Sequence, residues 1–259
     1  MSNPDLPEEL LDHVADLLHD ETHALKNCCL VSKSWIPRTR NHLFAGVAFR
    51  SPNNLRSWKK MFPDPSTSPA YYTRALVIKF PQVADAEEGC WIPTFSRVVN
   101  LKVDTRAATG DDLVRLTRLH ESVPAIKSFT AVFATAQSLR ISDLACSFPL
   151  VENLCLIGYG PRVGNTDGSE NQQAFVRPTG QLSLTGSLKI SVAEGMDPIA
   201  SRLLALQDRL LFRELELKLC REGDVSLTRA LIERCHPALE TLRIHYRLHG
   251  TLIQCLWRH

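Results

Sequence analysis

Apolar positions near the start of the chain recur with the spacing of an amphipathic helix. Between residues 8 and 18 they fall three and four residues apart, which places them on one side of a helix: Leu10, Leu11, Val14, Leu17 and Leu18. Pro7 suits the first position of this helix, because the N–H that proline lacks would have no partner there. Glu8 and Glu9 follow in the first turn, where the helix dipole favours negative charge.

Two further helices are predicted before residue 45. Asp20 and Thr22 are candidate caps for the second, and residues 32–44 predict a third that buries Val31, Trp35 and Leu43 and whose start is kinked or shifted by Pro37. Three helices in about 40 residues rarely bury enough apolar surface to be stable alone. Two interpretations remain open: the helices pack on the rest of this chain, or another protein completes their apolar face.

Beyond Arg74 the pattern changes to short units in which apolar and polar residues alternate, as in strands. The units recur about every 28 residues, within the range of about 20–29 typical of leucine-rich repeats. Their central residues are Leu76, Leu101, Phe129, Leu154, Leu188, Leu215 and Leu242. Helices are predicted between them at residues 110–123, 197–211 and 226–235, the second with Asp197 as its cap and Pro198 at its first position.

Strand, helix and strand at a regular period favour right-handed crossovers and a parallel sheet. The prediction is therefore an α/β fold, with three N-terminal helices (1–47), a helical connector (48–73) and an irregular leucine-rich-repeat-like solenoid (74–259). In the connector, Ser51 and Pro52 begin a helix that carries Leu55, Trp58 and Phe62 on one face. Repeat arrays normally end in a polar cap, which the last residues do not provide, so the repeat region is either incomplete at the C-terminus or needs a partner there.

Composition narrows the choice of partners and of compartment. A net charge of only +2 gives no electrostatic case for nucleic acid or an acidic membrane, and no apolar run approaches the 18 or so residues of a membrane span. The 8 cysteines lie mostly in apolar segments and form no Cys-x-x-Cys pair. They indicate reduced thiols in a cytoplasmic or nuclear protein.

The alternation also predicts which strand residues point away from the core. In each unit the residue between the two central apolar positions does so, giving a row of Val77, Lys102, Thr130, Cys155, Lys189, Glu216 and Arg243. This row is either a target-binding surface or a solvated sheet face. The candidate target contacts are Lys102, Thr130, Lys189, Glu216 and Arg243.

Known catalytic and cofactor motifs do not fit the sequence. Gly158, Gly160 and Gly164 follow a strand, but Pro161 and a polar run replace the helix that a dinucleotide loop needs. The C-terminal Cys and His residues have no standard zinc spacing: Cys235, His236, His245, His249, Cys255 and His259. We therefore expect no metal, no cofactor and no enzyme activity.

The N-terminal segment resembles a known motif. Leu6-Pro7, then Leu10, Val14 and Leu17, then the run Leu30-Val31-Ser32-Lys33-Ser34-Trp35 are similar to the F-box, and residues 42–49 resemble the tail of many fungal members. The resemblance covers about residues 5–45. It implies docking on the adaptor subunit of a Skp–cullin–F-box ubiquitin ligase, through Leu6, Pro7, Leu10, Val14, Leu17, Leu30, Val31 and Trp35. Some of these residues, Trp35 especially, are alternatively internal core of the three helices.

The F-box together with leucine-rich repeats resembles an architecture in which the repeats capture a substrate. The expected function is a non-catalytic substrate receptor that holds an unidentified target protein close to the ligase. The alternative is a scaffold that is built on the same parts and never joins an active ligase.

Overall fold

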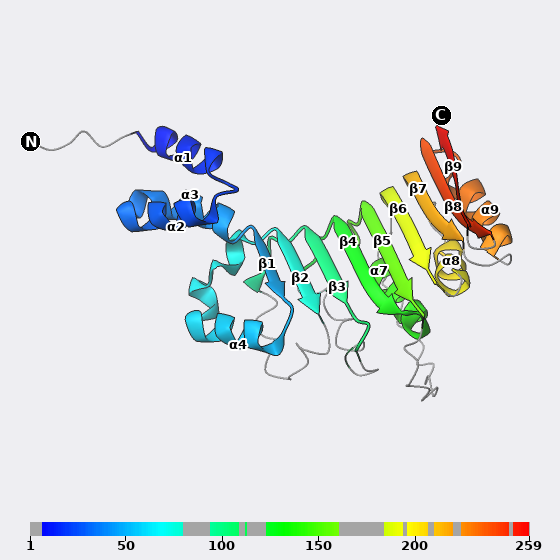
Figure 1. Ribbon diagram of the computed structural model, residues 1–259, viewed down its shortest axis with the longest axis horizontal. Coiled ribbons are helices and arrows are strands. Elements are labelled where there is room, and N and C mark those ends of the chain that lie inside the picture. The colour runs from blue at the N-terminus through cyan, green and yellow to red at the C-terminus, as the bar shows by residue number, and fades with distance from the viewer. Residues whose placement is uncertain are drawn as a thin grey trace, which may run out of the picture.

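The computed structural model describes residues 7–79, 94–108, 112, 123–160, 184–193, 196–206, 210–219, 224–248 and 251–258. The chain has an α/β fold, in which N-terminal helices precede a largely parallel sheet with interleaved helices. Figure 1 shows the N-terminal helices at one end of the molecule and the strands side by side in a curved row that leads away from them.

Three N-terminal helices form where the apolar pattern predicts them. They are α1 (Glu8–Leu17), α2 (Thr22–Val31) and α3 (Ile36–Leu43), with a 3-10 turn at Lys33–Trp35 before α3. Pro37 lies in the first turn of α3 and so sets its start, as predicted. Neither predicted cap of α2 acts as one: Glu21 precedes the helix, and no side chain caps it.

The described strands form one sheet whose order follows the chain, β1 to β9. They are β1 (Gly46–Phe49), β2 (Ala75–Lys79), β3 (Asn100–Asp104), β4 (Ser128–Ala134), β5 (Asn153–Tyr159), β6 (Thr185–Val192), β7 (Leu211–Leu219), β8 (Thr241–Leu248) and β9 (Thr251–Arg258). Neighbours pair in parallel except β8 and β9, which are antiparallel. Helices lie in the described crossovers from β1 to β2, β4 to β5, β6 to β7 and β7 to β8, and crossovers of this kind keep the directions of successive strands the same.

The predicted register of the sheet is confirmed. The central residues named above pair with one another in sequence, from Leu76 opposite Leu101 to Leu215 opposite Leu242. All of them except Leu242 are at most 2% exposed, and Leu242 is half-buried. One alternating pattern therefore continues through every repeat, since a slip of one residue would turn a whole strand inside out.

The α-helices described between the strands lie on one side of the sheet, along the outer side of its curve (Figure 1). They are α4 (Pro52–Met61), α7 (Ser138–Ser147), α8 (Asp197–Leu204) and α9 (Asp224–Cys235). Helix α4 contacts β1, α7 contacts β4 and α9 contacts β7, while α7, α8 and α9 contact one another in turn. Between sheet and helices lies one core cluster that runs from Val47 to Leu239.

Several predicted helix details are confirmed and others are wrong. Ser51 caps α4 by accepting a hydrogen bond from the Asn54 N–H at 3.3 Å, as expected. Asp197 does not cap α8; it is the first helical residue, and the Met196 N–H before it donates to Asp224 Oδ1 at 2.9 Å. Most of the helix predicted at 110–123 lies outside the described residues.

Among the α-helices and strands that the structure describes, β1, α7 and β9 were not predicted. Helix α7 is buried nearly all round, so its sequence lacks the amphipathic period that marks a surface helix. Strand β1 spans the expected boundary at residue 47 and pairs with β2, so the sheet begins before the predicted connector. The segment after β8 folds back as β9 and pairs with β8 in the antiparallel direction.

Candidate interaction surfaces

Helices α1 and α2 carry a set of apolar side chains that point into solvent. Their exposed fractions are 51% for Leu10, 40% for Val14, 69% for Leu17, 85% for Leu30 and 74% for Val31. We call these five residues the helical face. Leu10, Val14 and Leu17 share one side of α1, because residues three and four apart lie above one another on a helix.

A different set of residues holds the three helices together. Leu11, Ala15, Leu25 and Thr39 are buried, and the Thr39 hydroxyl donates to the Trp35 carbonyl at 2.7 Å. Helix α1 is therefore apolar on two sides, one inside the helical unit and one in solvent. Because the internal side already provides the packing, the helical face is available to a partner.

The predicted docking residues separate into three groups. Five form the helical face, Pro7 is also exposed, and Leu6 lies outside the described residues. Trp35 is half-buried, which leaves both of its interpretations open. The expectation that Val31 is buried within the third helix is wrong, since it ends α2 and faces solvent.

A charged cluster fixes α1 against α3. The Arg38 guanidinium donates from Nε to Asp16 Oδ1 at 2.6 Å and from Nη2 to Oδ2 at 2.5 Å, and His42 Nε2 lies 2.8 Å from Asp16 Oδ1. The hydrogen bonds from Arg38, and then from His42, hold the pKa of Asp16 well below its ordinary value. Sequence reasoning missed the cluster, because no local pattern links Asp16 to residues in another helix.

The sheet presents its second candidate surface on the side that faces away from the four helices. We call this the inner face. Strand pairing places the predicted row in register across it, Lys102 beside Thr130 and, further along, Lys189 beside Glu216 and Glu216 beside Arg243. The row predicted from alternation is therefore a real row of neighbours.

Two shallow cavities lie on the inner face over β4–β8. One, of about 170 Å³, is lined by Lys189, Glu216 and Arg243 together with polar residues of the row above them: Ser128, Asn153, Ser187, Glu214 and Thr241. The other, of about 220 Å³, is lined by Lys189, Glu216, Ser191, Lys218 and His245. Three of the five predicted target contacts thus meet at one place, while Lys102 and Thr130 do not line either cavity.

Charged groups occupy the middle of this region. Lys189 Nζ forms an ion pair with Glu216 Oε1 at 2.5 Å, and His245 Nε2 lies 3.7 Å from the same oxygen. Cys155 lies beside Lys189, but burial raises the pKa of its thiol, with Lys189 acting the other way. A thiol with a raised pKa is a weak nucleophile at neutral pH, so this cysteine has no sign of activation.

The remaining sequence signals have structural explanations where the structure describes them. Burial raises the pKa of Cys235 to about 11. Within the described ranges, no three His, Cys, Asp or Glu residues are grouped as metal ligands. His249 and His259 lie outside these ranges. Gly158 packs against the core, where a Cβ would lie 2.9 Å from Val192 Cγ1. The cysteines that the structure describes are all free thiols, and none of its described helices is long and apolar enough to cross a bilayer.

Comparison with known proteins adds no assignment: no protein-family model, curated protein or solved structure matches this chain.

Proposed function

We propose that this protein is the substrate-receptor subunit of a Skp–cullin–F-box ubiquitin ligase, with the helical face docking on the adaptor and the inner face of the sheet holding a target. The observation that carries the proposal is the exposure of the helical face. Leu10, Val14, Leu17, Leu30 and Val31 are five of the residues that the F-box resemblance selects for docking.

The exposed positions are unusual for residues of this type. A leucine that is 85% exposed contributes almost nothing to its own helix, and soluble proteins seldom gather several such side chains without a binding role. The 3-10 turn at Lys33–Trp35 begins two residues after Val31 and contacts both α1 and α2. Because this turn links the end of α2 to α1, we take Leu30 and Val31 to dock on the same partner as the exposed side chains of α1.

The other half of the proposal rests on the shape of the sheet. In-register parallel strands with helices along the outer side of a curve favour a leucine-rich-repeat-like solenoid, an architecture that offers an extended inner surface for protein binding. Such a receptor works by proximity. It raises the effective concentration of a target lysine near the ubiquitin-transferring enzymes and performs no chemistry itself.

The test is reconstitution with purified adaptor and cullin. The full chain should bind the adaptor in size-exclusion chromatography, and the double variant Leu17→Asp with Leu30→Asp should not. The matched control is Leu150→Asp, because Leu150 is also an exposed leucine, at 54%, but lies between α7 and β5 and not in the three N-terminal helices. Equal loss of binding in the control, or no binding by the natural chain, would overturn the proposal.

The same experiment distinguishes the scaffold alternative. A receptor should carry the adaptor into a complex with cullin, whereas a scaffold should bind the adaptor and exclude cullin. A stable three-part complex supports the ligase function, and an adaptor complex that never recruits cullin contradicts it.

A further inference from the structure

The inner face of the sheet carries an excess of positive charge. Alternation along the paired strands places basic side chains on this face at Lys79, Lys102, Lys189, Lys218, Arg243 and Arg258. The same positions hold fewer carboxylates: Asp104, Glu214 and Glu216.

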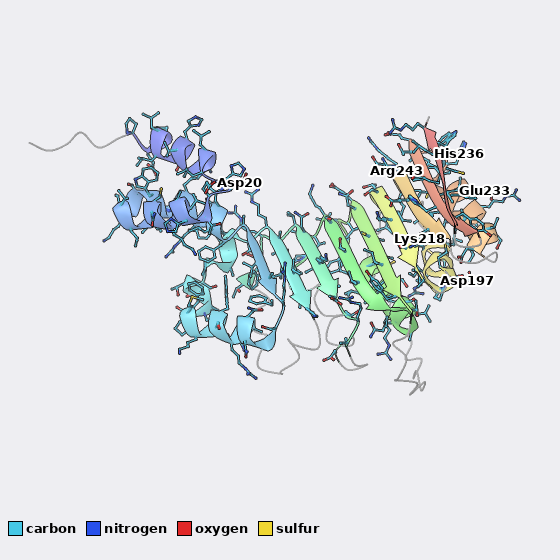
Figure 2. The ribbon with its side chains drawn as sticks, in the orientation of Figure 1. Asp20, Asp197, Lys218, Glu233, His236 and Arg243 are labelled. Carbon is cyan, nitrogen blue, oxygen red and sulfur yellow. The ribbon has the colours of Figure 1, made fainter. Side chains whose placement is uncertain are left out.

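Ion pairs neutralise some of these charges. Glu216 is already paired with Lys189, and Asp104 with Arg106 at 2.7 Å. Within the part of the chain that the structure describes, Lys218, Arg243 and Arg258 form no ion pair. Figure 2 labels Lys218 on β7 and Arg243 on β8, at the end of the sheet far from the N-terminal helices.

Two of these cations, Arg243 and Lys218, lie at the two cavities described above. Arg243 lines the cavity of about 170 Å³, Lys218 lines the one of about 220 Å³, and both cavities share Lys189 and Glu216, so they adjoin. His245 Nε2 is buried at the second cavity without a hydrogen-bond partner in the described structure. The site therefore offers a planar guanidinium and an ammonium among neutral polar groups and the carboxylates of Glu214 and Glu216, in two adjoining shallow cavities.

We propose that the inner face over β6–β8 binds an acidic segment of the target protein, with Asp or Glu carboxylates received by Arg243 and Lys218. The guanidinium fork matches a carboxylate with two parallel hydrogen bonds, and the Lys218 ammonium adds an unpaired positive charge next to it. This inference rests on the proposed function and gives its target a chemical class.

A peptide fits this surface better than a nucleic acid does. The chain as a whole carries a net charge of only +2, and carboxylates interrupt the basic positions of the inner face at Glu214 and Glu216. A continuous polyanion would bring phosphates against these carboxylates, whereas a peptide presents separate carboxylates that can avoid them.

The test is fluorescence anisotropy of the full chain with a fluorescein-labelled peptide in which Glu alternates with Ser. The comparison peptide has Gln in place of every Glu, and an unlabelled random-sequence oligonucleotide serves as competitor. The double variant K218E with R243E probes the site. Its matched control is R229E, which makes the same type of charge change at an exposed position of α9, on the helix side of the sheet.

The Glu peptide should bind more tightly than the Gln peptide, and added salt should weaken it. K218E with R243E should weaken it about tenfold, and R229E by less than about twofold. Equal binding of the two peptides, an equal effect of R229E, or no binding would overturn the inference, as would preference for the oligonucleotide. Because the assay contains no adaptor, failure of the helical face to dock would not affect it.

Discussion

Leu25 and Leu30 lie in the same helix, but truncating each of them to alanine should change the stability of the free protein by very different amounts. Leu25 is 1% exposed and Leu30 is 85% exposed, although both are leucines of α2. In the free protein, Leu30→Ala should therefore change the free energy of unfolding by less than about 0.5 kcal/mol. Leu25→Ala should cost about 2–5 kcal/mol, because it leaves a cavity inside the helical unit.

Adaptor binding should be weakened directly by Leu30→Ala, because Leu30 is the side chain that would contact the adaptor. Truncating leucine to alanine removes three carbons, worth about 2.4 kcal/mol when all are buried at about 0.8 kcal/mol each. Since Leu30 is 85% exposed before docking, full burial on the adaptor would newly bury most of that surface, and its loss should cost about 2 kcal/mol. This corresponds to roughly a 30-fold higher dissociation constant for Leu30→Ala.

Two measurements separate these effects. Hydrogen exchange of the α1–α3 amides reports the stability of the helices, and isothermal titration calorimetry with the adaptor reports the dissociation constant. The reasoning fails if Leu30→Ala loosens the helices as much as Leu25→Ala does, which would make Leu30 a core residue. It also fails if Leu30→Ala binds the adaptor within about twofold of the natural chain, since the side chain would then stay exposed in the complex.

Three further predictions concern the fold. Gly186→Ala should destabilise the protein by more than about 1 kcal/mol in urea denaturation, because Gly186 has φ +76° and a Cβ would lie 2.3 Å from the Glu152 carbonyl oxygen. The control is Gly46→Ala, which should have no such effect, because no atom lies within 4 Å of a Cβ added there. Because Asp16 has a lowered pKa, its contribution to folding stability is present above the ordinary carboxyl pKa of 3.8 and is lost as the pH falls below that value. Hydrogen exchange should therefore show that α1 loosens on acidification. The variant Asp16→Asn should show the same loosening already at neutral pH. Arg202→Ala should destabilise the protein by up to about 3 kcal/mol, because Arg202 Nε lies 2.5 Å from Asp143 Oδ1 and burial already raises the pKa of Asp143. Replacing both residues by leucine should recover most of this loss in the same denaturation assay.

Strands β2 to β8 and their register could be predicted from the sequence. Alternating leucines at a regular period require the same face of every repeat to point inward, so Leu76, Phe129 and Leu215 fall in one row without any knowledge of the loops between them. The row of residues on the inner face, from Val77 to Arg243, follows from the same alternation. Local periodicity is enough here because each repeat packs mainly on its neighbours.

Partners that lie far apart in the chain needed the tertiary structure. Leu10 and Leu11 are adjacent leucines with equal hydrophobicity, and only the packing of α1 on its neighbours shows that Leu11 is internal and Leu10 exposed. The pairing of Asp16 with Arg38 depends on the angle between two helices, which no spacing in the sequence encodes. Buried α7 was invisible for a related reason, since a helix enclosed on all sides has no polar face to mark its period.

For the candidate sites, the sequence determined which residue types are present and which side of a strand they occupy. It placed Lys189, Glu216 and Arg243 in one row, and it selected Leu30 and Val31 as docking residues. The tertiary structure decided that the first three meet at a cavity while Lys102 and Thr130 do not, and that Leu30 and Val31 point into solvent. Periodicity is a property of one segment, whereas exposure and cavities depend on what other segments cover, and that is settled only when the chain has folded.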